Sequence, residues 1–254
     1  TMSDRKRSAI EPARAAGPPL RFIPNPADAS FTACCNGKKL LFEKDRIAIF
    51  RSPQPDCPCV ALRFVGASKN APEGFLPVGG FSAREDGKTC CETLPAYGML
   101  KYANVWEGVD LELSACETGL KMNWVLAAPK YVSAIRLRWE GALSLELDGD
   151  GALLIRHAQG ILKDAPPAAW QVQNADVSPI PCAYRLWGGS EVGFALSACD
   201  EGAPVVIDPL LSSRKNHRRR PVVCFCRSFS PFFSPSGTPT ARKTPQRSAR
   251  CTPG

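Results

Sequence analysis

The second half of the chain alternates apolar and polar residues with a period of two. Successive side chains of a β-strand point to opposite faces, so each alternating segment is predicted to be a strand with one buried face. Turn-forming residues separate the segments, and no stretch of twelve or more residues has the apolar spacing of a helix. The alternating segments are 109–115, 119–127, 134–140, 143–148, 182–187 and 191–196.

This pattern predicts an all-β fold of antiparallel strands packed as a β-sandwich, with two β subdomains as an alternative arrangement. Three more strands are expected at 38–43, 46–50 and 60–65, whereas the Gly- and Pro-rich stretch 66–93 is expected to be an extended excursion over the sheet. The mid-strand residues expected to be buried in the core are Leu111, Trp124, Leu137, Leu145 and Phe194.

Composition divides the chain into three parts. Residues 1–20 are rich in Ala, Pro and Arg and are predicted to form a flexible leader. The β-rich domain is expected to span 21–211, with a sub-boundary near 90–97 as an open alternative. Residues 212–254 contain six prolines and no acidic residue, a composition that predicts a disordered tail.

The formal net charge of +8 is unevenly distributed along the chain. Ten of the 32 basic residues lie in 212–254, whereas all 24 acidic residues lie in 1–211. The predicted domain is therefore slightly acidic and the tail strongly basic. We expect no nucleic-acid binding by the domain, and only weak electrostatic binding through the basic segment 214–220.

Neither a membrane span nor an export signal is expected. The longest apolar runs have four or five residues, which is too short for a helix that crosses a bilayer. The first twenty residues also lack the apolar stretch of a secretory signal. The residues alone therefore leave a cytoplasmic location as one alternative.

The residue types that bind metals or act as nucleophiles give little support for a metal site or a catalytic triad. With His157 and His217 as the only histidines, multi-histidine metal sites and a Ser–His–Asp triad are not expected. The twelve cysteines include no CxxC spacing, so no metal and no cofactor is expected. A cytoplasmic, cysteine-rich metal-binding protein remains an alternative.

Acidic residues in and just before one predicted strand form the first candidate site. Glu107, Asp110 and Glu112 offer the paired carboxylates that a glycoside hydrolase requires. Asp110 and Glu112, however, lie on the polar face of that strand, where solvated side chains are typical. We therefore expect no catalytic residue, and a carbohydrate-active hydrolase with strand-borne carboxylates is kept as an alternative.

The tryptophans offer a second kind of site. Trp124 and Trp139 share a face with apolar neighbours and are predicted to lie in the core. Trp187 lies on the same strand face as Arg185 and is the candidate for stacking on a ligand.

Several segments occur in a recognisable order: YGMLKYANVWEGVDLEL at 97–113, GLKMNWVLAAPKYVSAIRLRWEGA at 119–142, and Ile207-Asp208-Pro209. This series resembles a bacterial domain of unknown function that precedes seven-bladed β-propeller (SBBP) repeats in cell-surface proteins. The resemblance covers about 190 residues, 21–211, although Ala27 and Asp28 stand where the family has Gly and Gln. The residues that match the family motifs, and to which we assign structural roles, are Phe22, Asn25, Tyr97, Tyr102, Gly108, Asp110, Ile207, Asp208 and Pro209.

The resemblance implies a non-catalytic structural or interaction module of a bacterial surface protein, located at the cell surface or outside the cell. Its partner would be an unknown protein or a component of the cell envelope. Relatives continue after the Ile-Asp-Pro motif into a first propeller strand, which residues 212–254 do not resemble. We interpret these residues either as a genuine alternative end or as an out-of-frame translation of the propeller region.

Overall fold

The structure is a computed structural model that describes residues 21–212, apart from 36–37, 52–57, 86–87, 117–118 and 174–175. The predicted leader at 1–20, the predicted tail from residue 213 onward and the basic segment 214–220 lie outside these residues. Within them the fold is all-β, as the alternation predicted, and the strand pairs are antiparallel. The helical element of the described part is a 3-10 helix, η1, at Pro129–Ala134, where the sequence predicted a turn.

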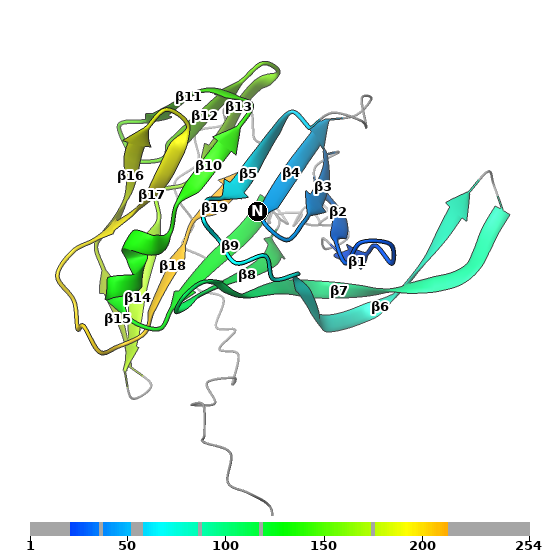
Figure 1. Cartoon of the computed structure of the whole chain (residues 1–254), viewed down its shortest axis with the longest axis horizontal. Helices are drawn as coiled ribbons and strands as arrows, with labels where there is room; N and C mark the ends of the chain where they lie inside the picture. The colour runs from blue at the N-terminus through cyan, green and yellow to red at the C-terminus, as the bar shows by residue number, and fades with distance from the viewer. Residues whose placement is uncertain are drawn as a thin grey trace, which may run out of the picture. The chain divides into compact units, whose positions relative to one another are not determined.

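The first sheet contains eight strands in the order β1-β2-β3-β4-β5-β10-β17-β16 within the described part of the chain. It joins the N-terminal strands to three strands from the second half (Figure 1). The bounds of its strands are β1 Ile23–Pro24, β2 Phe31–Cys35, β3 Lys38–Phe42, β4 Arg46–Arg51, β5 Val60–Phe64, β10 Leu137–Glu140, β16 Cys182–Gly188 and β17 Glu191–Leu196.

The second sheet contains eleven described strands and is branched. One edge of β9 pairs with β8, while its other edge pairs with both β18 and β19. The sheet continues from β18 to β14 and β15, and from β19 to β13, β12 and β11. The bounds are β6 Glu73–Glu85, β7 Lys88–Trp106, β8 Val109–Cys116, β9 Gly119–Leu126, β11 Ala142–Leu147, β12 Leu153–His157, β13 Gly160–Asp164, β14 Ala168–Gln173, β15 Asp176–Ile180, β18 Val205–Asp208 and β19 Leu210–Ser212.

Pro209 marks the point at which this sheet branches. Proline has no backbone N–H, so the ladder along β18 cannot continue through it without interruption. The Pro209 carbonyl still accepts a hydrogen bond from the Met122 backbone N–H at 3.4 Å. On either side of Pro209 the register is regular, with Ile207 opposite Trp124 and Leu211 opposite Leu120.

The apolar faces of the two sheets meet in one core. Phe64 of the first sheet makes edge-on contacts with Tyr102 and Trp124 of the second, with ring centroids 5.6 Å and 5.8 Å apart. Of the five residues predicted to be buried, Leu111, Trp124, Leu137 and Phe194 are buried. These four burial predictions are confirmed.

The prediction for Leu145 and its neighbours needs correction. Leu145 is only partly buried, although it packs against the core. Leu143, which was expected to share its face, is 75% exposed. Leu143 lies within the register shift between Ala142 and Ser144 and has no paired residue on β12, which explains why its side chain is not held on the inner face.

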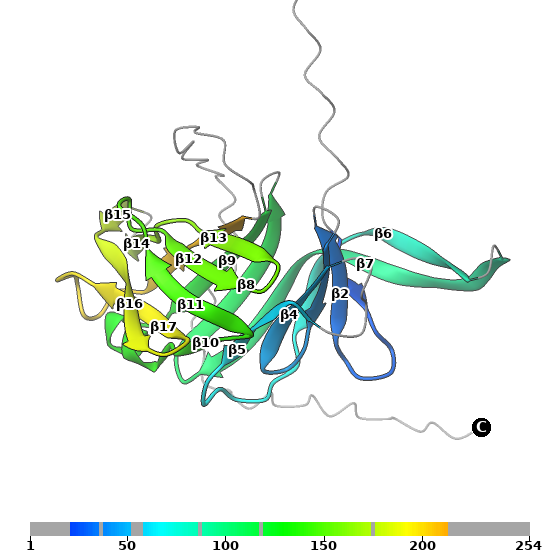
Figure 2. The same ribbon diagram turned by 90° about the horizontal axis from the view of Figure 1, so that it is seen from above.

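The prediction that 66–93 forms an extended excursion over the sheet is also wrong. β6 and β7 form a long hairpin, in which β6 pairs with no other strand of the described part. Figure 2 shows the far end of this hairpin reaching away from the other strands. Pro77 is tolerated because β6 is an edge strand. Register shifts near Gly79 and Arg84 interrupt the alternation of apolar and polar residues by which β6 could have been recognised in the sequence. β7 runs without interruption through 90–97.

Candidate functional site

The longest family motif lies on the hairpin formed by β7 and β8. Trp106 pairs with Val109, so Glu107 and Gly108 form a two-residue turn between them. Gly108 has a φ of +68°, a conformation that favours glycine. A Cβ atom at this position would lie 2.6 Å from the Tyr131 ring, which η1 supplies. Glycine is therefore required here by both its backbone conformation and its surroundings.

Asp110 stabilises a bulge within the same hairpin. The backbone N–H of Asn104 donates a hydrogen bond to the Asp110 carboxylate at 2.8 Å. Asn104 has a φ of +48° and lies in the register shift between Tyr102 and Trp106. Lys101 contacts the Asp110 carboxylate at 2.8 Å and that of Glu112 at 3.7 Å. The two carboxylates on this strand face are thus held by one lysine.

Tyr102 and Trp106 connect the two sheets through backbone carbonyls. The Tyr102 hydroxyl donates to the carbonyl of Glu43 at 2.9 Å, and burial raises the pKa of this phenol. The indole N–H of Trp106 donates to the carbonyl of Val65 at 3.0 Å. Both acceptors lie in connections of the first sheet, so these side chains fix its position on the second.

The N-terminal motif forms a turn that leads into β2. Phe22 is fully buried and exchanges two backbone hydrogen bonds with Tyr97, each 2.9 Å long. The Asn25 carboxamide oxygen accepts a bond from the Ala27 N–H at 3.2 Å, and the Asn25 N–H bonds to the Ser30 carbonyl at 2.7 Å. These bonds close the turn on itself and hold the start of the domain against β7.

The closing motif lies at the branch of the second sheet. Ile207 is fully buried, whereas the Asp208 carboxylate lies 2.8 Å from the Lys121 ammonium. Burial raises the pKa of Asp208, and Lys121 acts in the opposite direction. The Oδ1 atom of Asp208 has no hydrogen-bond partner among the residues that the structure describes.

A buried acid near this branch was not singled out from the sequence. Asp164 ends β13, is 3% exposed, and pairs with Leu211 of β19. Burial raises its pKa to about 7, which the neighbouring Tyr184 side chain opposes and the nearby Asp208 reinforces. The Tyr184 hydroxyl donates to the Ala165 carbonyl at 3.1 Å. Asp164 is thus a proton-binding group that is closed to solvent.

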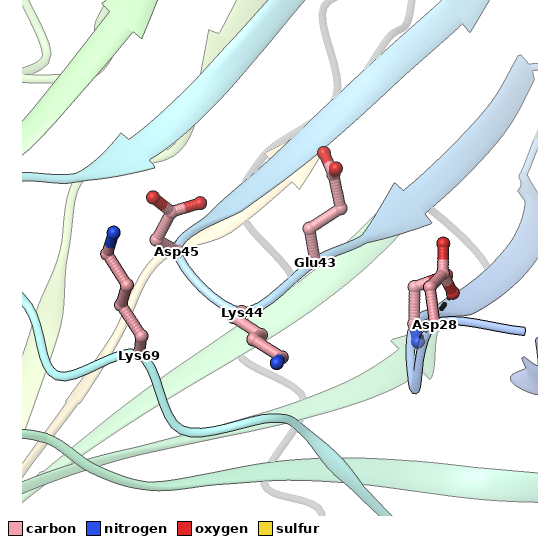
Figure 3. A pocket seen from close by; sticks show the side chains of 6 residues that line it. Asp28, Glu43, Lys44, Asp45 and Lys69 are labelled. Atoms are coloured by element: carbon pink, nitrogen blue, oxygen red, sulfur yellow. Dashed lines mark hydrogen bonds between the residues drawn. The ribbon is translucent and has the colours of Figure 1, made fainter.

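A cavity of about 280 Å³ lies beside the turn between β3 and β4. Figure 3 shows its charged side chains, which come from the turn after β1, from 43–45 and from the segment that follows β5. Its acidic groups already have partners: Asp28 accepts from Ser30, Glu43 pairs with Arg46, and Asp45 lies 2.8 Å from Arg63. The residues lining the cavity are Asp28, Ser30, Glu43, Lys44, Asp45 and Lys69.

Trp187, the candidate for stacking on a ligand, lies on β16 and is 37% exposed. The guanidinium of Arg185 lies 4.0 Å from its ring centroid, and that of Arg136 lies 5.1 Å away. Two cations therefore lie within cation–π distance of the indole ring. Stacking on a ligand stays a prediction.

The cysteine and histidine side chains are dispersed. In the part of the chain that the structure describes, no group of three or more His, Cys, Asp or Glu residues is placed to hold a metal ion. The described free thiols belong to Cys34, Cys59, Cys182 and Cys199, and burial raises the pKa of Cys182 to about 12. No helix among the described residues is long and apolar enough to cross a membrane.

A comparison with protein families identifies the domain. The family described as Domain of unknown function (DUF7948) matches residues 23–210, which is most of the chain. The chain belongs to the DUF7948 family. No curated protein and no solved structure matches it. Within the DUF7948 domain, the polar motif residues contact the backbone or neighbouring side chains of the domain itself.

Proposed function

We propose that this DUF7948 domain is a non-catalytic structural or interaction module of a bacterial surface protein, of the kind that precedes SBBP propeller repeats. The observation that carries the proposal is that polar side chains of the family motifs form hydrogen bonds within the domain. Asn25, Tyr102 and Asp110 each bond to the backbone of the domain. Residues engaged in this way maintain a scaffold.

The geometry disfavours the hydrolase alternative. Glycoside hydrolysis requires two carboxyl groups facing each other across a substrate, one of them with a raised pKa. Asp110 and Glu112 share Lys101 on one strand face. The acid whose pKa is raised to about 7 is Asp164, which is 3% exposed and so cannot contact a substrate.

The position of the last described strand supports a structural role. β19 pairs with β9 on one edge and with β13 on the other. The Ile-Asp-Pro motif therefore leads into a strand that is held on both sides.

One pair of measurements tests the proposal. The full-length protein and its D110N variant would be incubated with a panel of polysaccharides, and new reducing ends would be counted. The carboxamide introduced by D110N keeps an oxygen that can accept the Asn104 N–H, so the variant should stay folded. We expect no hydrolysis by either protein. Hydrolysis that D110N abolishes without a change in melting temperature would show that the domain is an enzyme.

The surface location needs its own test. Intact bacteria that express the gene would be treated with proteinase K, and the domain would be followed by immunoblotting. We expect the domain to be digested while a cytoplasmic marker is protected. Protection of both would contradict a surface location and favour the cytoplasmic alternative. Metal analysis of protein purified under reducing conditions addresses the cysteine-rich metal-binding alternative.

A further inference from the structure

The outer edge of β16 is an unpaired strand edge. β16 is the last strand of the first sheet and pairs only with β17 among the described strands. Its second half, Arg185–Gly188, is exposed, whereas Tyr184 is buried. Figure 1 shows β16 at the border of the sheet. An unpaired edge offers a row of backbone donors and acceptors to which another extended segment can bind.

The side chains beside this edge carry surplus positive charge. Arg136 and Arg138 both contact Glu191, with 3.0 Å between the Arg138 Nε atom and the carboxylate. These two guanidinium groups lower the pKa of Glu191, which is therefore ionised and offsets one of them. Arg185 has no carboxylate partner in the described part of the chain. Two arginines thus share one glutamate, and Arg185 adds a third positive charge over the Trp187 ring.

The surplus charge is held in a defined orientation. Arg185 stacks on Trp187 at 4.0 Å, which leaves the edge of its guanidinium plane available as a fork of N–H donors. Trp187 itself lies close to the backbone of β17, since a Cβ atom on Gly193 would be 3.0 Å from the indole nitrogen. A stacked guanidinium loses less side-chain entropy when it binds a carboxylate than a freely moving one.

The opposite face of the same edge is apolar. Leu186 pairs with the buried Val192 and is itself 40% exposed, because no further strand covers it. An added strand would therefore meet arginine on one face and leucine on the other. Side chains alternate along a strand, so the complementary segment alternates acidic and apolar residues.

We propose that the edge of β16 binds an extended acidic segment of a partner protein, which adds a further strand to the first sheet. Its carboxylates pair with Arg185 and Arg136, and its apolar side chains cover Leu186. A second copy of β16 is a poor occupant, because it would bring like charges together at the edge. The proposal rests on the interaction role assigned above and names the chemistry of the partner.

Fluorescence anisotropy with a labelled, end-capped octapeptide of alternating Glu and Val tests this directly. We expect the full chain to bind it, and R185Q to weaken binding about tenfold, because a charge-assisted pair is lost. The matched control is R156Q. Arg156 is also exposed, but it lies on β12 and pairs with Glu146. The basic segment after residue 212 is common to all variants, so its contribution cancels in the comparison.

Two further peptides separate strand addition from simple charge attraction. N-methylation of alternate peptide nitrogens blocks backbone hydrogen bonds and should weaken binding, and R185E should shift the preference toward a Lys–Val peptide. Equal affinity of the wild type and R185Q for the Glu–Val peptide would overturn the proposal. So would indifference to N-methylation, which would show charge attraction without an added strand. Neither result would alter the hydrolysis and protease tests of the proposed function.

Discussion

Replacing Asp164 with asparagine should remove a large part of the pH dependence of stability. The pKa of Asp164 is raised from 3.8 to about 7 in the folded protein, chiefly by burial. Between these values the folded state binds a proton that the unfolded state has released. The free energy of unfolding must therefore fall as pH rises from about 4 to about 7.

The size of this effect follows from the shift. One pKa unit corresponds to about 1.4 kcal/mol, so a shift of roughly three units corresponds to about 4 kcal/mol. The stabilisation is fully present below pH 4 and is lost once the pH has passed through 7. The carboxamide of D164N is neutral at every pH, so this variant lacks the pH-dependent component.

The assay is urea unfolding of the wild type and D164N at unit intervals from pH 4 to pH 8, followed by tryptophan fluorescence. We expect D164N to gain stability relative to the wild type as pH rises. D150N serves as the control, because Asp150 is exposed in the turn that follows β11. A difference between the wild type and D164N that does not change with pH would refute the buried, proton-binding role of Asp164.

Three other substitutions, with L143A as a control, test the packing around the family motifs. G108A should lower stability by about 1–3 kcal/mol, because it combines a positive φ with a contact against the Tyr131 ring, and a thermal melt would detect the loss. Y102F should cost about 1–2 kcal/mol in urea unfolding, because the Glu43 carbonyl loses its donor. L111A should cost about 2–5 kcal/mol through the cavity it leaves, whereas L143A, at a 75% exposed position, should stay within about 0.5 kcal/mol of the wild type. Equal effects of L111A and L143A would contradict the strand register.

The sequence revealed the strands whose two faces differ most. Trp124 and Leu111 lie in uninterrupted alternation, and because each has a buried inner face the pattern determined both the strand and its orientation. β6 was missed because an edge strand with Pro77 and a register shift loses its alternation, and only its pairing with β7 identifies it. Leu143 was misplaced for the same reason, since a bulge is a property of two strands together.

The candidate sites were less accessible to sequence reasoning. Asp164 lies two residues after Leu162, so on a strand the acid shares the face of an apolar residue. Its burial, however, depends on a strand nearly fifty residues further along the chain. The clustering of Arg185 with Arg136 is likewise non-local, because β16 and β10 are brought together only through β17. Trp187 was correctly placed on the face of Arg185, whereas the second cation over its ring could be found only from the structure.

The central position of β18 and β19 has a consequence for synthesis of the chain on the ribosome. These strands are translated last among the described ones, yet β9, β13 and β14 all pair with them. Until residues 205–212 emerge, those three strands present open edges that favour association between nascent chains. Folding must therefore finish after translation of this segment. A chain that stops before residue 205 would be a target for chaperones and proteases rather than a slightly smaller domain.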